Sequence, residues 1–193
     1  MSRRPGPPGP GRTRPETALP GLPGLPDLRP LRQVAAALEA AGIPFALGGS
    51  GLLAALGLAR TVHDWDLTTD AGLEPVSAGL GGLRPEIVGP GGVHEDSKLR
   101  FAGGTVELIV RMAIRTEAGA CRIPTMMGGA WRGVPLGSPE AWAVAYALLG
   151  REEKAGLLFG YLESRGAGRG AVARLLAEPL PEAVAARVRA LAG

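Results

Sequence analysis

Cysteine is nearly absent from this sequence, since Cys121 is the only one among 193 residues. A single cysteine cannot form an internal disulfide, which excludes a disulfide-stabilised fold and suits a reducing compartment. We therefore expect a cytoplasmic protein. The residues around Cys121 are typical of a strand, and no histidine is placed to activate its thiol. A cysteine nucleophile is not expected for this reason.

Aromatic residues are scarce at 4%, and long apolar runs are missing. The hydrophobic content of 46% still suffices for a packed core, which must consist mainly of Leu, Ala and Val. No apolar stretch reaches the roughly 18 residues that a membrane-spanning helix needs, so we expect no membrane association. The basic N-terminal residues have no apolar segment behind them, so we expect no secretory signal there.

Lysine is rare as well, with two residues against 19 arginines, and the net charge is +3. That excess lies in residues 1–30, whereas residues 31–193 contain 16 basic and 16 acidic residues. The balance excludes the strong basic excess of a dedicated nucleic-acid-binding domain. Residues 1–26 hold eight prolines and five glycines, a composition that predicts a disordered tail. The tail is either dispensable or an electrostatic tether to RNA or another acidic partner.

The remaining chain divides into a mixed half and a helical half. We expect an α/β (α+β) fold, in which a mixed sheet of four or five strands over residues 27–136 is flanked by helices. A helical subdomain over residues 137–193 follows, beginning at Ser138-Pro139-Glu140, a strong helix start. Apolar periodicity, caps and turn residues predict helices near 27–41, 51–56, 74–80, 139–149, 151–165, 170–177 and 181–191, and strands near 44–47, 62–68, 86–88, 98–101, 105–110, 122–124 and 131–134.

Two short motifs in the mixed half carry chemistry. Gly48-Gly49-Ser50 follows an apolar strand, and its glycines let backbone amides approach phosphate oxygens closely. We expect Ser50 to cap the next helix, whose N-terminus would favour an anion. Asp64 and Asp66 are two apart on an extended segment, so their carboxylates share one face, opposite Trp65. Paired carboxylates are typical ligands for the magnesium ions of a nucleoside triphosphate.

A third carboxylate is expected from a neighbouring strand. Glu107 is the one acid inside the apolar segment 105–110, and a buried carboxylate needs a metal or a charged partner. Two interpretations stay open here: Glu107 completes the metal site, or it forms an ion pair with Arg100 or Arg111. An alternative interpretation of Asp64 and Asp66 is that they are plain surface acids at a strand edge.

The order of these elements over residues 30–125 resembles the nucleotidyltransferase superfamily with the polymerase-beta-like fold. That pattern is a Gly-Gly or Gly-Ser turn, an aspartate-hydrophobic-aspartate strand and a separate acid. In size the chain is similar to a small bacterial branch that includes aminoglycoside and toxin-type nucleotidyltransferases. The chain departs from that branch at Tyr146, where members often carry a lysine, and at Lys154-Ala155, where they often carry Lys-Asp.

The resemblance implies Mg²⁺- or Mn²⁺-dependent transfer of a nucleoside monophosphate from a nucleoside triphosphate to a hydroxyl group. It implies that Asp64, Asp66 and Glu107 bind metal and act in catalysis, Glu107 also helping to accept the acceptor's proton. Gly48, Gly49, Ser50 and Lys154 would then hold the triphosphate. A protein or small-molecule acceptor is favoured, with tRNA as an option through the basic tail. The alternative is a catalytically inactive binding module of the same fold, for example half of a toxin–antitoxin pair.

Three further groups of residues could be mistaken for functional sites, and each has a structural interpretation. Trp142 and Tyr146 share a helical face that either packs in the core or stacks on a nucleotide base. His63 should be a packed or capped histidine, and the acids of the cluster at residues 94–96 are expected in a solvated loop.

Overall fold

The structure is a computed structural model that describes residues 24–192. Most of the tail predicted to be disordered, residues 1–23, therefore lies outside the described residues. At the start of the described chain, the carbonyl of Gly24 accepts a hydrogen bond from the Val62 amide at 2.8 Å. Leu25 packs against the hydrophobic core. The last residues of the predicted tail thus contact the folded part.

The first helix, α1 (Leu28–Ala40), forms where the sequence predicts it. The Asp27 carboxylate caps it by accepting the Arg29 amide at 2.9 Å. Leu31, Val34 and Leu38 recur at helical spacing and are buried on one side. Behind α1 come β1 (Ala46–Leu47) and α2 (Gly49–Ala55).

A seven-stranded sheet forms the centre of the molecule, in the order β3-β4-β5-β2-β1-β9-β8. The expectation of four or five strands is therefore too small. Its remaining strands are β2 (Trp65–Thr69), β3 (Glu86–Val88), β4 (Ser97–Phe101), β5 (Val106–Val110), β8 (Met127–Trp131) and β9 (Val134–Gly137). The pairs β2/β5 and β1/β9 are parallel and the other pairs are antiparallel.

A separate two-stranded hairpin joins β6 (Ala113–Thr116) to β7 (Gly119–Arg122). Sequence patterns placed a strand at 122–124 and missed β6, because residues 113–116 do not alternate cleanly between apolar and polar. β8 was also placed too late, since Gly128 and Gly129 disfavour a strand by propensity. Pairing with β9 overrides that preference.

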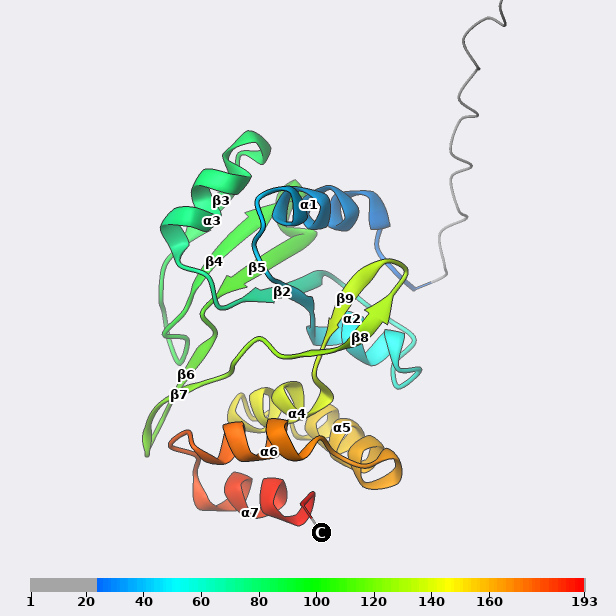
Figure 1. Cartoon of the computed structure of the whole chain (residues 1–193), viewed down its shortest axis with the longest axis vertical. Coiled ribbons are helices and arrows are strands. Elements are labelled where there is room, and N and C mark those ends of the chain that lie inside the picture. The colour runs from blue at the N-terminus through cyan, green and yellow to red at the C-terminus, as the bar shows by residue number, and fades with distance from the viewer. Residues whose placement is uncertain (1–23, 193) are drawn as a thin grey trace, which may run out of the picture.

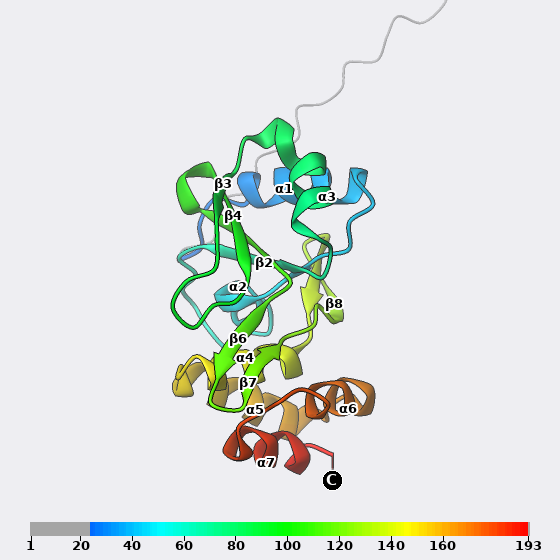
Figure 2. The same cartoon turned by 90° about the vertical axis from the view of Figure 1, so that its left-hand side faces the viewer.

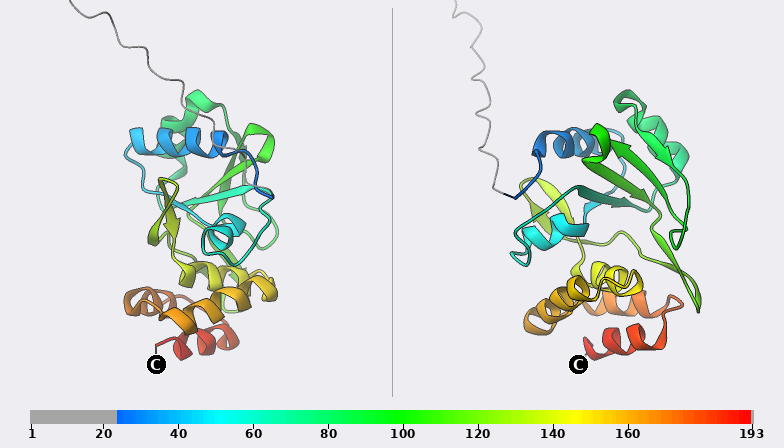
Figure 3. Two further views of the ribbon diagram at one scale, coloured as in Figure 1. Left: turned by 90° about the vertical axis from the view of Figure 1, so that its right-hand side faces the viewer. Right: turned by 180° about the vertical axis from the view of Figure 1, so that it is seen from behind.

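Helices cover both faces of the sheet (Figure 1). α1 and α3 (Leu73–Leu80) lie on one face, while α4 (Pro139–Leu148) lies on the other. α5 (Glu152–Arg165), α6 (Arg169–Leu176) and α7 (Glu182–Ala190) pack around α4 and form a helical layer beneath the sheet, as Figures 2 and 3 show. Short 3₁₀ turns at Gly81–Leu83 and Ala102–Gly104 complete the elements.

The helical layer is tied together at the predicted start of α4. The Ser138 hydroxyl accepts the Ala141 amide at 3.2 Å and donates to the Glu140 carboxylate at 2.5 Å. The buried Glu140 also accepts the Gly168 amide at 2.7 Å, which joins the N-terminus of α4 to that of α6. Across residues 24–192 the helices are too short or too polar to cross a bilayer.

Candidate active site

Asp64 and Asp66 lie at the start of β2, on the sheet face that α4 covers. The intervening Trp65 points to the opposite face, where its indole N–H donates to the Asp27 carbonyl at the start of α1 at 3.1 Å. The Asp66 carboxylate lies against Gly49 instead, and burial, followed by the charge of Asp66, raises the pKa of the Tyr146 hydroxyl on α4. The predicted alternation along β2 is therefore confirmed. Both carboxylates are half-buried.

Glu107 lies beside Asp66 on the neighbouring strand. β2 and β5 run parallel with Asp66 directly opposite Glu107, so the two side chains leave the same face of the sheet. The Glu107 carboxylate also forms two ion pairs. Arg100 Nε donates to its Oε1 at 2.7 Å, and Lys98 Nζ lies 3.3 Å from its Oε2. Arg111, the other partner considered from sequence, instead donates to the Asp70 carbonyl.

The Gly48-Gly49-Ser50 turn lies directly against Asp66. The Gly48 amide donates to the Asp66 carbonyl at 2.8 Å. Gly49 has φ +54°, and a Cβ there would lie 1.9 Å from Asp66 Oδ2. A side chain at this position would therefore displace the carboxylate, so only glycine permits this approach. The turn and the aspartate strand form one unit.

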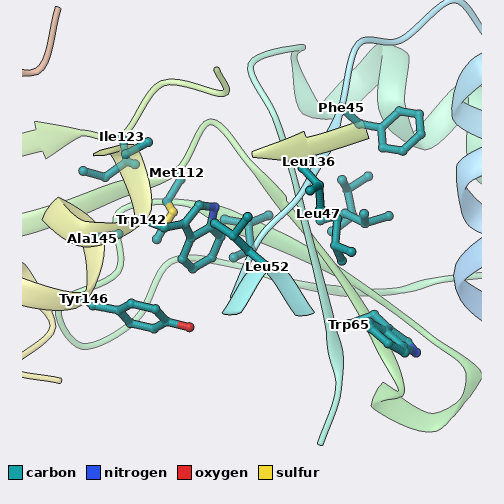
Figure 4. Packing of buried hydrophobic residues seen from close by; sticks show 14 of the residues in the cluster. Phe45, Leu47, Leu52, Trp65, Met112, Ile123, Leu136, Trp142, Ala145 and Tyr146 are labelled. Atoms are coloured by element: carbon teal, nitrogen blue, oxygen red, sulfur yellow. The ribbon is translucent and has the colours of Figure 1, made fainter. Parts of the chain in front are cut away.

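One expectation about this turn, the capping role of Ser50, is wrong. Gly48, not Ser50, is the N-cap of α2, and Ser50 lies inside the first helical turn with 7% of its surface exposed. The Trp142 indole packs directly against Gly48, because a Cβ at this position would lie 2.0 Å from the ring. The lack of a side chain at position 48 therefore makes room for the Trp142 ring. Figure 4 shows Trp142 among the core side chains beside Leu52.

Trp142 and Tyr146 belong to the core, which was one of the two alternatives for them. They are 4% and 0% exposed, and their ring centroids are 5.6 Å apart. The Tyr146 hydroxyl is buried with no hydrogen-bond partner among the described residues. Two cations approach its ring: Lys154 Nζ lies 5.4 Å and Arg151 Cζ 6.0 Å from the centroid.

Arg151 is a site residue that sequence reasoning missed. It follows α4 and lies against the Tyr146 ring, and its charge opposes the rise in the pKa of both Asp66 and Tyr146. The sequence did contain one signal for Arg151. It lies three residues before Lys154, close to the Lys154-Ala155 pair that replaces the Lys-Asp pair of the family pattern. Lys98 was missed too, although it is two residues from Arg100 and thus on the same strand face.

The electrostatics of the site single out Asp66. Burial, followed by the charges of Asp64 and Glu107, raises the pKa of Asp66 to about 7, while Lys98 and Arg151 oppose the rise. Glu107 behaves differently. Burial raises its pKa, but the hydrogen bond from Arg100 and the charge of Lys98 outweigh burial and leave the pKa lowered. Glu107 is therefore ionised at neutral pH.

The donor set partly fits a divalent cation. Neighbouring carboxylates repel each other and gain from a cation between them, and Mg²⁺ prefers such oxygens. The charge of Asp64 contributes to the raised pKa of Asp66, so this pair meets the description. Glu107 does not complete a cluster, because its carboxylate faces Lys98 and Arg100, and no group of three acids, histidines or cysteines in residues 24–192 is arranged around a common point for a metal.

The other flagged residues lie apart from this site. His63 is exposed, so it is not packed, which was one of the two alternatives expected for it. Asp96 was expected in a solvated loop but is only 3% exposed; it lies 3.5 Å from His94 and accepts the Ala113 amide. Cys121 is buried, and burial, with the charge of Glu178, raises the pKa of its thiol to about 12. That pKa agrees with its exclusion as a nucleophile.

Comparison with solved structures identifies the fold. A crystal structure of the aminoglycoside nucleotidyltransferase ANT(2'')-Ia in complex with adenylyl-2''-tobramycin matches 84% of this chain and 97% of its own, with a TM-score of 0.51 and 17% identity. A solution structure of the antibiotic-resistance factor ANT(2'')-Ia matches 83% and 89%, with a TM-score of 0.52 and 18% identity. The chain has the nucleotidyltransferase fold. No protein-family model and no curated protein matches this nucleotidyltransferase-fold chain.

Proposed function

We propose that the protein is an Mg²⁺-dependent nucleotidyltransferase that moves a nucleoside monophosphate from a nucleoside triphosphate to a hydroxyl group. The acceptor hydroxyl releases its proton to solvent, its oxygen attacks the α-phosphorus, the bond from that phosphorus to the bridging oxygen breaks, and pyrophosphate leaves. The observation that carries the proposal is the alignment of Asp64, Asp66 and Glu107 on one sheet face, with Gly49 against Asp66. The fold shared with ANT(2'')-Ia adds support.

Asp64 and Asp66 are the proposed magnesium ligands. The bound metal would supply positive charge to the phosphates and to the attacking oxygen. Asp66 supports this role because burial, followed by the like charges of Asp64 and Glu107, raises its pKa, and a cation would relieve the repulsion. We propose Glu107 as a third acid that contacts the metal once its carboxylate turns from Lys98 and Arg100. Its lowered pKa makes it a weak proton acceptor, which argues against the base role expected from sequence.

The triphosphate would lie between the Gly-Gly-Ser turn and the start of α5. The Gly48 amide is engaged by the Asp66 carbonyl, so in this proposal the amide of Gly49 and the amide and hydroxyl of Ser50 contact phosphate, while Gly48 positions them. Arg151 and Lys154 would neutralise phosphate charge from the helical side. Both cations already lie near the Tyr146 ring, on the side of α4 that faces Asp66.

Loss of transfer in Asp66→Asn tests the assignment. Asparagine keeps the size of the side chain but removes the charge that a metal requires. We expect transfer of label from α-labelled triphosphate to fall at least 100-fold while circular dichroism stays unchanged. The control is Glu117→Gln, which removes an exposed carboxylate between β6 and β7 and should leave transfer unaffected. Full activity in folded Asp66→Asn would refute the assignment.

The acceptor is proposed to be a protein or a small hydroxyl-bearing molecule, with tRNA as the other candidate. Residues 31–193 contain as many acidic as basic residues, which argues against a continuous RNA-binding face. Incubation with labelled triphosphate, Mg²⁺ and cell lysate, followed by separation into protein, RNA and small molecules, identifies the labelled class. Label confined to RNA, and lost on deletion of residues 1–26, would overturn the preference.

A second candidate, a catalytically inactive module of the same fold, is favoured by one observation. The Glu107 carboxylate is held by Arg100 and Lys98 instead of facing a shared metal position. Thermal melting separates the candidates, because a ligand raises the melting temperature only if it binds the native state. An enzyme should be stabilised by Mg²⁺ and triphosphate together, whereas a protein-binding module should show no shift with either.

A further inference from the structure

A cavity of about 380 Å³ lies where the C-terminal ends of β2 and β5 meet α6. It is separate from the proposed nucleotide site, because Asp70 on its wall is four residues beyond Asp66, or roughly 13 Å along the strand direction. Its charged lining consists of three arginines and two acids: Arg111, Arg122, Arg174, Asp70 and Glu178.

The three arginines arrive from three different elements. Arg111 directly follows β5 and has φ +54°, a left-handed conformation that residues other than glycine rarely adopt. Its amide donates to the Thr69 carbonyl at 2.7 Å, which fixes its backbone beside the end of β2. Arg122 ends β7, and Arg174 belongs to α6. The cavity thus joins the sheet, the hairpin and the helical layer.

The two acids are already engaged. Asp70 accepts the Thr125 amide at 2.9 Å and lies 3.6 Å from Arg174. Glu178 accepts the main-chain amide of Arg122 at 3.0 Å. Within residues 24–192, the guanidinium groups of Arg111 and Arg122 form no ion pair with a carboxylate. Their charges are therefore available inside the cavity.

We propose that this cavity binds the phosphate group of a small molecule. Phosphate presents several oxygens and up to two charges, which suits planar guanidinium groups that converge from different directions. The volume lies within the range of small-molecule sites, so it leaves room for an organic group attached to the phosphate. The ligand would bridge the sheet and α6. This inference does not depend on the proposed nucleotidyl transfer.

Isothermal titration of the full-length, metal-free protein with inorganic phosphate at constant ionic strength tests the proposal. We expect saturable binding that weakens at least tenfold in Arg122→Ala, because that guanidinium has no structural partner to lose. Arg122→Lys should lose part of the affinity, since it keeps the charge without the planar fork. The matched control is Arg165→Ala, an exposed arginine of α5 outside the cavity, which should bind phosphate like the wild type.

Several results would overturn the proposal. One is the absence of saturable phosphate binding; another is an equal loss in Arg165→Ala. Unchanged affinity in Arg122→Ala would place the phosphate elsewhere, for example near Ser50. A parallel titration with a short single-stranded oligoribonucleotide covers a polymeric source. Binding of the oligonucleotide without binding of phosphate would replace the small-molecule site with an RNA contact.

Discussion

Replacing Asp66 with asparagine should stabilise the metal-free protein above neutral pH. The Asp66 carboxylate is half-buried beside two other acids, which raises its pKa to about 7 from an ordinary value of 3.8. The folded protein therefore holds a proton on Asp66 that the unfolded chain releases between pH 4 and 7. Asparagine carries no charge at any pH and avoids this penalty.

The sign and size of the effect follow from proton linkage. Below about pH 4 both states carry a protonated Asp66, so the carboxyl adds no pH dependence. As pH rises from about 4 to 7, the folded state binds more protons than the unfolded state, and the free energy of unfolding falls. The full shift corresponds to about 4 kcal/mol. Partial solvent exposure reduces this value. We therefore expect the free energy of unfolding of Asp66→Asn, measured relative to the wild type, to be about 2–3 kcal/mol higher at pH 8 than at pH 4.

Urea unfolding in the presence of a chelator at pH 4, 6 and 8 measures this gain. The corresponding difference in melting temperature is roughly 5–10 °C for a protein of this size. Glu117→Gln, which removes an exposed acid, should show no such pH-dependent gain. The reasoning is refuted if the stability difference between Asp66→Asn and the wild type does not change from pH 4 to 8, or if it changes in the opposite direction.

Further predictions concern the packing around the site. Gly48→Ala should lower the free energy of unfolding by about 3 kcal/mol in urea titrations, because the new Cβ would meet the Trp142 indole at 2.0 Å. Gly156→Ala is its control: no atom lies near a Cβ in this mid-helix position, so stability should rise by about 0.5–1 kcal/mol. Glu140→Ala should cost about 2 kcal/mol, since it leaves the Gly168 amide without its acceptor. Equal melting temperatures of this variant and the wild type would contradict that role.

Local patterns in the sequence predicted most elements of the fold. The helical spacing of Leu31, Val34 and Leu38 predicted α1, and Ser138 as an N-cap predicted the start of α4. The same-face placement of Asp66 and Glu107 could be expected from strand alternation once their strands were taken as neighbours. The parallel pairing of β1 with β9 could not, because it joins residues about 90 positions apart and leaves no local signal.

The details of the site depended on contacts between distant segments. Gly48 resembles a phosphate-binding glycine in sequence, yet the structure places Trp142 against it, a contact that α4 creates. Arg100 could be anticipated as a partner of Glu107 because they face each other in a hairpin. For Arg151 the sequence offered only its position close to Lys154, because the packing of α4 against the sheet brings it near Asp66.

The fate of two phosphate labels tests the central claim, transfer of a nucleoside monophosphate, most directly. The wild-type protein is incubated with Mg²⁺, heat-inactivated cell lysate and a triphosphate radiolabelled on either the α- or the γ-phosphate. We predict that the α-label appears in the acceptor and that the γ-label appears only in released pyrophosphate. Appearance of the γ-label in the acceptor, or α-label transfer that continues undiminished in folded Asp66→Asn, would contradict the account.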